Sequence, residues 1–335
     1  MDRIKKSKTI MTYSNGITIM SNATTEHQCG CGHQSSSITL LVDNKAGEGL
    51  ECVHGFAAWI KIRDRRILFD TGQKGVILKN AERLGIDLAD AEVLVMSHGH
   101  DDHTDNLADF YAINPKAPMY CGQNIDADRF CCRPGEQSLN WSPPASAKEI
   151  FANLPAEQKH VLTAPHYFLP GVAATGPVPR LTAFEDVGDA LFLDAAGTKP
   201  DPVSDDMSMW FETDKGLVIL LGCCHSGIVN TVNYIRKVSG MEKVSGIVGG
   251  MHLIRANEER MKNTLEAMKS WNLDWLIPCH CTGDKAMQQM KDYLGDKVTF
   301  GCTGTVIELG QFPEKQAGDF SMCKKHAHAC GCGCA

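Results

Sequence analysis

Short apolar runs alternate with amphipathic segments through the middle of this chain, while both ends are polar and irregular. Runs of about four to eight residues that are rich in Val, Ile, Leu and Phe are typical of buried strands. Such runs predict strands at 38–43, 55–62, 66–70, 92–97, 117–121, 217–222, 244–249, 274–278 and 298–308.

Helical periodicity predicts helices at 75–85, 228–238, 257–271 and 284–294. In the third of these, Met261, Leu265 and Met268 recur at helical spacing, and charged residues fall on the other face. Asn257 stands at its start and is of a residue type that caps helix N-termini. Strands that are followed by helices along one chain indicate a layered α/β domain.

The alternating pattern covers residues 38–312, which we interpret as one domain between a polar, Cys/His-containing extension (1–37) and a Cys/His-rich tail (313–335). A segment rich in Pro and aromatic residues, at about 122–180, interrupts it. We interpret this segment as an insertion that forms a wall or lid over the site, or else as a stabilising excursion without substrate contact. Both ends of the chain could hold a soft metal ion, but we expect no catalytic role for them.

Composition and charge limit the class of protein. The chain has 335 residues, 43% of them apolar, and a formal net charge of −7. It contains no apolar run long enough to cross a bilayer, and its start lacks the apolar core of a secretory signal. We therefore expect a cytoplasmic protein without a membrane partner. The negative charge argues against a nucleic-acid partner, although it leaves room for a local phosphate pocket. The oligomeric state stays open.

The chain contains 15 cysteines, an odd number. Two pairs, at 131–132 and 223–224, are adjacent, which suits bridging poorly. With no export signal, we expect free thiols in a reducing cytoplasm rather than a disulfide framework.

The predicted strand at 92–97 leads directly into the sequence HGHDDH, residues 98–103. His98 and His100 are two residues apart, so in an extended segment both imidazoles point to the same side. Asp102 and His103 then fall in a turn, where they can reach a second ion. Imidazole and carboxylate ligands suit zinc, and also iron or manganese. The alternative is a His-rich surface loop, which the preceding buried strand disfavours.

HGHDDH matches the HxHxDH signature of the metallo-β-lactamase superfamily. The rest of the chain resembles the branch typified by 7,8-dihydropterin-6-methyl-4-(β-D-ribofuranosyl)aminobenzene 5′-phosphate synthase. The matching stretches are LLVDN (40–44), HGFAAWI (54–60), ILFDTGQ (67–73), TGPVPR (175–180), GLVILLGCCHSGIVNT (216–231), GGMHL (249–253) and IPCHCTG (277–283). The resemblance implies a four-layer αββα sandwich with metals at the rim, where strand ends meet loops. It also implies two divalent ions, for which we favour zinc, with iron or manganese as alternatives.

The resemblance assigns His98 and His100 to one ion, and Asp102 and His103 to the other. It also implies that His280, which follows a predicted strand, is a ligand of the second ion.

His225 follows the strand at 217–222, where the commoner branches of the superfamily carry an Asp that bridges both ions. We expect His225 to be a metal ligand, but the sequence leaves open which coordination position it occupies. In the resembled branch this region typically reads Gly-Cys-Ser-His, so Cys224 departs from it. Cys224 is either a ligand or a small buried residue, while for Cys223 we favour the small buried residue.

Three further residues are candidates for supporting or substrate-binding roles. Asp70 ends a strand in ILFDTGQ, and we expect it to orient the metal loop by hydrogen bonds, with a plain turn as the alternative. The chain has no second D-T-G or D-S-G, so an aspartic protease would need a dimer. His252 in GGMHL is a candidate for substrate binding, support or ligation. Arg180 is either a phosphate- or carboxylate-binding residue or a surface arginine. His54 and His166 could line the pocket, but neither has a comparable sequence context.

Bound divalent ions bring the pKa of water towards neutrality and polarise a substrate oxygen. We expect Asp102 and His225 to be catalytic, with Asp102 both a ligand and a hydrogen-bond partner of the nucleophile. The resemblance implies a phosphorylated or pterin-like small-molecule substrate and a reaction that joins a dihydropterin diphosphate to a ribofuranosyl-aminobenzene phosphate, releasing pyrophosphate. Hydrolysis of a phosphodiester, lactone or thioester is the alternative. An RNA-processing nuclease lacks support in the charge pattern, and a non-catalytic metal-handling protein remains a third hypothesis.

Overall fold

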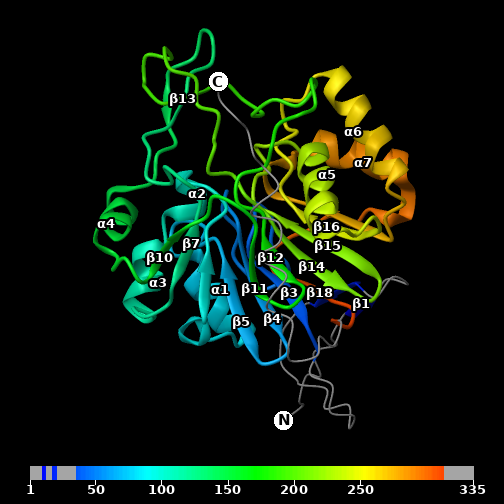
Figure 1. Ribbon diagram of the computed structural model, residues 1–335, viewed down its shortest axis with the longest axis horizontal. Coiled ribbons are helices and arrows are strands. Elements are labelled where there is room, and N and C mark those ends of the chain that lie inside the picture. The colour runs from blue at the N-terminus through cyan, green and yellow to red at the C-terminus, as the bar shows by residue number, and fades with distance from the viewer. Residues whose placement is uncertain (1–9, 13–16, 21–34, 313–335) are drawn as a thin grey trace, which may run out of the picture.

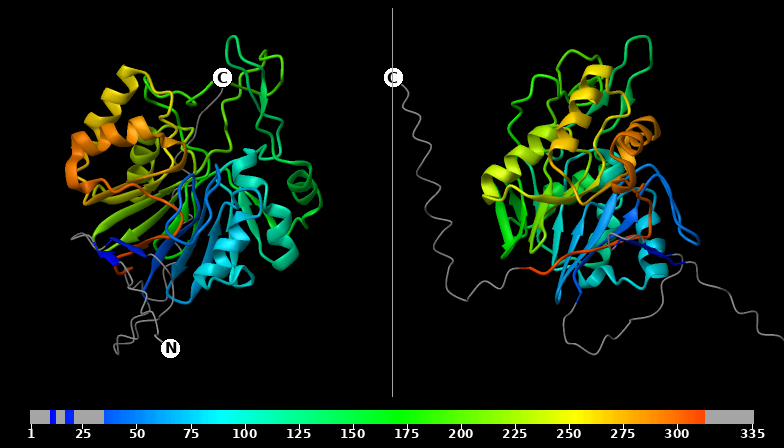
Figure 2. Two further views of the ribbon diagram at one scale, coloured as in Figure 1. Left: turned by 180° about the vertical axis from the view of Figure 1, so that it is seen from behind. Right: turned by 90° about the vertical axis from the view of Figure 1, so that its right-hand side faces the viewer.

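Two β-sheets lie face to face, and helices cover both of their outer surfaces (Figure 1). The computed structural model describes residues 10–12, 17–20 and 35–312. Figure 2 shows the same layers from two further directions. The order of layers is helix, sheet, sheet, helix, which confirms the predicted αββα sandwich.

The first sheet has the strand order β1-β2-β18-β3-β4-β5-β6-β7-β10. Its strands β5, β6, β7 and β10 pair in parallel, so their carboxyl ends meet at one edge. The bounds are β1 (Ile10–Thr12), β2 (Ile17–Met20), β3 (Ser37–Val42), β4 (Ala57–Ile62), β5 (Arg65–Phe69), β6 (Val93–Val95), β7 (Met119–Cys121), β10 (Lys159–Val161) and β18 (Thr305–Glu308).

The second sheet has the order β11-β12-β14-β15-β16-β17, and its last three strands are parallel. A small third sheet has the order β13-β8-β9. The bounds are β8 (Phe130–Cys131), β9 (Leu139–Asn140), β11 (His166–Leu169), β12 (Val172–Ala174), β13 (Leu191–Phe192), β14 (Met209–Thr213), β15 (Gly216–Leu221), β16 (Val244–Gly249) and β17 (Trp275–Pro278).

The helices divide between the two outer surfaces. Helices α1, α3 and α4 pack on the first sheet, and α5, α6 and α7 pack on the second. The side chain of Asn257 accepts a hydrogen bond from Arg260 N at 2.8 Å, which confirms the predicted cap of α6. The bounds are α1 (Val76–Leu84), α2 (Asp101–Thr104), α3 (Leu107–Ile113), α4 (Ala145–Asn153), α5 (Ile228–Ser239), α6 (Glu258–Ser270) and α7 (Asp284–Leu294), with short 3-10 helices at Leu88–Asp90, His280–Thr282 and Gly295–Lys297.

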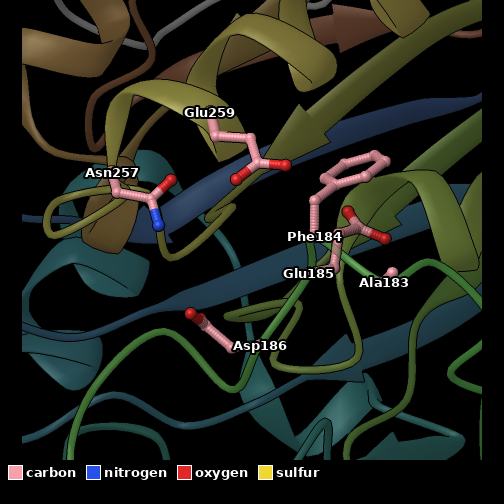
Figure 3. Close-up of a pocket in the computed structure, with 6 residues that line it drawn as sticks. All are labelled: Ala183, Phe184, Glu185, Asp186, Asn257 and Glu259. Atoms are coloured by element: carbon pink, nitrogen blue, oxygen red, sulfur yellow. The ribbon is translucent and has the colours of Figure 1, made fainter.

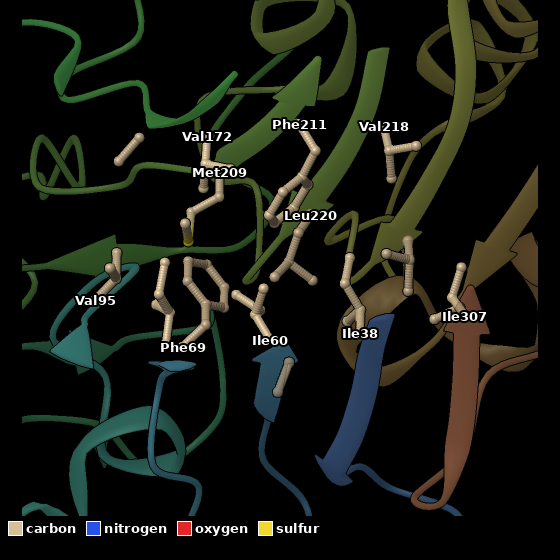
Figure 4. Packing of buried hydrophobic residues seen from close by; sticks show 14 of the residues in the cluster. Ile38, Ile60, Phe69, Val95, Val172, Met209, Phe211, Val218, Leu220 and Ile307 are labelled. Atoms are coloured by element: carbon tan, nitrogen blue, oxygen red, sulfur yellow. The ribbon is translucent and has the colours of Figure 1, made fainter. Parts of the chain in front are cut away.

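The core lies between the two sheets (Figure 4). Ile60 and Phe69 of the first sheet face Phe211 and Leu220 of the second, and all four side chains are fully buried. Burying a side chain of this size contributes roughly 1.5–3 kcal/mol. The packed interior therefore holds the two sheets, and the strand ends at their rim, in fixed relation.

The predicted strand at 298–308 is only partly correct, because β18 begins at Thr305. Gly304 adopts a positive φ of 91°, and Thr305 N donates to Cys302 O at 2.9 Å, so a turn precedes the strand.

The Pro- and aromatic-rich segment at 122–180 is divided between two environments. Its strand β10 joins the first sheet, and β11 and β12 join the second. Strand β8 instead pairs with β9 on one side and with β13, from later in the chain, on the other. Strand β13 lies in the part of the chain that projects at the top of Figure 1. The projecting part therefore combines two separate stretches of sequence.

Of the predicted extension 1–37, only 10–12, 17–20 and 35–37 are described, and the tail 313–335 lies outside the described residues. Among the described helices, none has the length and apolar character that crossing a membrane requires.

Candidate metal centre

The ligand candidates gather at the rim of the sandwich, beyond the carboxyl ends of parallel strands. The HGHDDH stretch follows β6, and three strands of the second sheet, β15, β16 and β17, lead into the other candidates. The structure brings these side chains into one buried cluster: His98, His100, Asp102, His103, Cys223, His225, His252 and His280.

Three imidazoles form a first candidate metal position. Nε2 of His98 lies 2.9 Å from Nδ1 of His100, and the ligand atoms of both lie within 4.8 Å of that of His225. The Nδ1 atom of His225 is 2.7 Å from the carbonyl oxygen of Val187, which leaves Nε2 for the cluster. That Nε2 is buried and has no hydrogen-bond partner among the described residues. An unpartnered buried nitrogen of this kind fits a metal ligand.

Four donor atoms form a second position beside the first. Nε2 of His103 lies 3.2 Å from Nε2 of His280, and the Cys223 sulfur lies 3.2 and 3.3 Å from these two atoms. Oδ2 of Asp102 is 3.3 Å from the same atom of His280 and 3.7 Å from that of His103. Zinc bonds of about 2.0–2.3 Å in tetrahedral geometry separate neighbouring ligand atoms by roughly 3.3–3.6 Å. These five distances, from 3.2 to 3.7 Å, are close to the spacing of a tetrahedral ligand set.

Asp70 fixes the loop that carries the motif. Its carboxylate accepts hydrogen bonds from Ser97 N and Ser97 Oγ, each at 2.6 Å, and lies 2.8 Å from Nδ1 of His103. Asp70 is fully buried and has a positive φ of 56°, a conformation that L residues rarely adopt. Its contact with Nδ1 turns Nε2 of His103 towards the other donors.

His280 is oriented in the same way by the end of β3. Oδ1 of Asn44 lies 3.0 Å from Nδ1 of His280, and Asp43 accepts a hydrogen bond from its backbone N–H at 2.8 Å. Nε2 of His280 is therefore left to face the cluster. Neither supporting residue was predicted from the sequence, although both lie in the matching stretch LLVDN.

Two adjacent carboxylates, Asp205 and Asp206, hold the ligand loops and were also missed. Asp206 accepts hydrogen bonds from His225 N at 3.0 Å and Ser226 N at 2.8 Å. Asp205 accepts one from Gly99 N at 2.8 Å. Both precede β14, in a stretch where no element was predicted, and neither carries a local sequence signal of its role.

Burial sets the protonation of the first position. It lowers the pKa values of His98, His100 and His225 well below the ordinary value, so these imidazoles are neutral and keep a lone pair for a metal. At the second position burial opposes ionisation of Asp102, yet the imidazoles around it lower its pKa well below the ordinary value. Burial likewise opposes protonation of His103, yet Asp102 and Asp70 raise its pKa to about 9. The second position therefore pairs a carboxylate with a protonated imidazole, and a bound cation would replace that proton.

The two adjacent cysteines take different positions, and only that of Cys223 departs from the favoured interpretation. Cys224, named as a candidate, points away from the cluster, with its sulfur 3.4 Å from Oγ1 of Thr231 in the layer under α5. Cys223, interpreted as a small buried residue, instead contributes its sulfur to the second position. The reason is the turn after β15, in which Cys224 adopts a positive φ of 59°.

Arg180, predicted either to bind a phosphate or carboxylate or to be a surface arginine, is exposed and contacts backbone carbonyls. Its guanidinium donates to the carbonyl oxygens of His225, Pro202 and Val203. Backbone carbonyls therefore occupy guanidinium N–H groups that would otherwise bind a phosphate or carboxylate. Arg180 instead clamps the loop that carries His225 to the segment before β14.

His252 lies beside the first position. It is 6% exposed, its ring centroid lies 4.3 Å from that of His225, and it has a positive φ of 43°. Neither ring nitrogen has a hydrogen-bond partner among the described residues. Such an imidazole can ligate, donate a proton or contact substrate.

His54, which the sequence left as a possible pocket residue, forms the solvent side of the cluster. Its Nε2 lies 3.2 Å from Oδ2 of Asp102, and its side chain is 63% exposed. This contact raises the pKa of His54, although burial opposes the shift. The Asp102 end of the cluster therefore reaches solvent.

The hollow shown in Figure 3 lies elsewhere, between residues 183–186 and the start of α6. Its volume is about 250 Å³. Two of its three acidic residues already have partners in the fold: Glu185 accepts from Val229 N and Asn230 N at the start of α5, and Asp186 pairs with Arg260. None of its lining residues belongs to the metal-ligand groups.

Comparison with known proteins identifies the family. Over 254 residues, the chain is 32% identical to the 7,8-dihydropterin-6-methyl-4-(β-D-ribofuranosyl)-aminobenzene-5′-phosphate synthase of Methanocaldococcus jannaschii, covering 71% of this chain and 85% of that protein. The chain belongs to the metallo-β-lactamase superfamily, in the branch of this synthase.

The chain is also similar to two other proteins. An uncharacterized protein of Methanocaldococcus jannaschii is 31% identical over 275 residues, which are 81% of this chain and the whole of that protein. The crystal structure of Tm1679, described as a metal-dependent hydrolase of the β-lactamase superfamily, has a TM-score of 0.69 at 23% identity and covers 82% of this chain and 100% of that one. No family model matches the chain. The metallo-β-lactamase fold implies divalent metal binding, and the His, Asp and Cys groups described above supply ligands for it.

Proposed function

We propose that this protein is a dinuclear metal enzyme that acts on a phosphorylated or pterin-like small molecule. The observation that carries the proposal is the set of four donor atoms of Asp102, His103, Cys223 and His280, spaced at 3.2–3.7 Å beside a second set of three imidazoles. Two adjacent buried ligand sets are the arrangement on which two-metal hydrolysis and transfer depend.

The ligands favour particular metals. Imidazoles, a carboxylate and a thiolate suit zinc or ferrous iron, whereas magnesium prefers oxygen ligands. We therefore favour zinc, with iron next; manganese, the other sequence-based alternative, fits a sulfur ligand less well.

The residues of the chain have separate tasks in this proposal. Two bound divalent ions would supply Lewis-acid activation of a nucleophile and would offset charge on a phosphate. Asp102 holds the attacking group by a hydrogen bond at the edge that reaches solvent. His225 would hold the first ion, and its backbone N–H donates a hydrogen bond to Asp206. The buried imidazole of His252 is placed to donate a proton to a departing group or to bind substrate.

We infer the substrate class from the similarity to the synthase of Methanocaldococcus jannaschii. The reaction that this relationship suggests joins a dihydropterin diphosphate to a ribofuranosyl-aminobenzene phosphate and releases pyrophosphate. We extend this to the chain as a proposal only, because one fold hosts many reactions. The substrate would be a small molecule, with no nucleic-acid or membrane partner, in a cytoplasmic protein.

One observation favours hydrolysis as a second candidate. The side chain of His54 is 63% exposed while it contacts Asp102, so solvent lies next to the proposed nucleophile position. Water could then attack a phosphodiester, lactone or thioester in place of a second substrate.

A single assay separates the candidates. Zinc-loaded protein, prepared anaerobically, is incubated with the dihydropterin diphosphate with and without the ribofuranosyl-aminobenzene phosphate, and pyrophosphate and products are measured by mass spectrometry. Pyrophosphate release that requires both substrates supports transfer, and release from the diphosphate alone supports hydrolysis. His100→Ala should abolish either activity, and Cys224→Ser should retain it. If the protein binds zinc and turns over neither these substrates nor a panel of phosphodiesters, lactones and thioesters, the metal-handling hypothesis replaces the enzyme.

A further inference from the structure

The metal centre contains a second thiol that neither ligand set uses. Cys281 follows His280 directly and is 4% exposed. Its sulfur, that of Cys223 and the ligand atom of His280 lie within 4.8 Å of one another. The Cys281 sulfur also lies 3.7 Å from the carbonyl oxygen of Cys223. Two buried thiols therefore meet at the second metal position.

The backbone is shaped to allow this approach. A Cβ atom on Gly250 would lie 2.6 Å from the Cys281 sulfur and 2.5 Å from the carbonyl oxygen of Gly222. Glycine at 250 therefore lets the Cys281 side chain reach the end of β15, where Cys223 stands. Cys224 and Cys279 are close in sequence but pack into separate apolar layers.

We propose that Cys223 and Cys281 form a disulfide in the metal-free protein, so that oxidation and metal binding compete for the Cys223 sulfur. A disulfide sulfur carries no thiolate charge and cannot serve as the anionic ligand of the second ion. Side-chain rotation must bring the two sulfurs to a bond length of about 2.05 Å, which moves Cys223 away from His103 and His280.

A hydroperoxide can supply the oxidation. One thiolate attacks the peroxide, so that an S–O bond forms, the O–O bond breaks and an alcohol or water leaves. The second thiol then attacks that sulfur, the S–S bond forms, the S–O bond breaks and water leaves. Two thiols thus lose two electrons and two protons, and one peroxide is reduced. A metal ion on Cys223 would block the reaction by holding that sulfur.

The full-length protein, stripped of metal under anaerobic conditions, is treated with one equivalent of hydrogen peroxide, alone or after loading with zinc. Non-reducing peptide mapping by mass spectrometry then looks for the Cys223–Cys281 cross-link. We expect the cross-link in the metal-free protein and its suppression by zinc. Oxidised protein should bind about one zinc ion fewer than untreated protein. Treatment with a thiol reductant should restore the lost zinc binding.

Cys224→Ser is the matched control, because it removes a neighbouring buried thiol that points away, and it should keep the cross-link. Cys281→Ser should lose the cross-link while still binding zinc. Absence of the link in the metal-free protein would overturn the proposal, as would equal linkage with zinc bound. The inference rests on the proposed metal centre but not on its reaction, since cross-linking is read without any turnover.

Discussion

The sulfur of Cys223 lies 3.2 Å from Nε2 of His103, although 120 residues separate them in the chain. Nδ1 of His103 lies 2.8 Å from the carboxylate of Asp70, so its other nitrogen is free to face the sulfur. His280 is equally close to both atoms, so one cation could bind all three once it displaces the proton on His103, whose pKa is raised to about 9.

Cys223→Ser should weaken binding at the second position, because a hydroxyl replaces a thiolate. Removing a residue that only supports a ligand by a hydrogen bond typically lowers metal affinity roughly 10- to 100-fold. We expect the loss of a ligand itself to lower the affinity by at least as much. Titration with Co²⁺ measures it, since a thiolate ligand adds a sulfur-to-cobalt charge-transfer band. The variant should lose this band and Cys224→Ser should keep it; the opposite pattern would reverse the assignment of the two cysteines.

Asp70→Asn should lower metal affinity about 10- to 100-fold while the ligands themselves stay intact. The neutral amide no longer offers the two carboxylate oxygens that hold Ser97 and Nδ1 of His103. Competition with a chromogenic chelator gives the affinity. Asp109→Asn, an exposed change on α3, is the control. Equal affinities in the two variants would mean that Asp70 is only a turn residue.

Arg180→Lys should lower metal content and thermal stability, since one ammonium group cannot reach the three carbonyls that the guanidinium spans. The KM for a phosphorylated substrate should change little in those molecules that still hold metal. Metal content, melting temperature and KM are measured together. A large rise in KM at full metal content would restore the phosphate-binding role that the sequence suggested.

Asp205 gives the stability a defined pH dependence. Burial raises its pKa to about 6 from an ordinary 3.8, although Arg129 pairs with it. The folded state therefore binds this proton more tightly than the unfolded state, so the group adds stability as the pH falls through 6 towards 3.8. Between pH 7 and pH 5 the gain is about 1–2 kcal/mol.

Asp205→Asn should lack this gain. Unfolding by urea in the presence of a chelator, at pH 7 and pH 5, gives the difference between wild type and variant free of metal effects. That difference should shift in favour of the wild type at the lower pH. A difference that does not depend on pH would contradict the raised pKa.

The sequence revealed those parts of the site whose signal is local. His98 to His103 form one contiguous motif after an apolar strand, and His280 stands at the end of another strand. Because the carboxyl ends of parallel strands meet at one edge of a sheet, the α/β pattern alone predicts that these residues lie close together. Asn257 was correctly predicted to cap α6 for the same reason, since a cap depends on its immediate neighbours.

The remaining parts depend on geometry that the sequence pattern does not contain. Whether Cys223 or Cys224 faces the metals is decided by one positive φ in the turn after β15. The contact between Asp205 and Gly99 spans 106 residues, and each residue alone resembles an ordinary loop residue. Strand β14 was not predicted, although all five of its residues are buried, because Glu212 and Thr213 interrupt its apolar run.

The central claim is that the cluster binds two metal ions. Elemental analysis of anaerobically purified full-length wild type, of His100→Ala, of His280→Ala and of the double variant tests it most directly, because the Cys-rich ends of the chain are the same in all four. We predict that each single variant contains about one ion fewer than wild type and the double variant about two fewer. Equal metal content in all four proteins would show that the metal is bound elsewhere and would contradict the dinuclear centre.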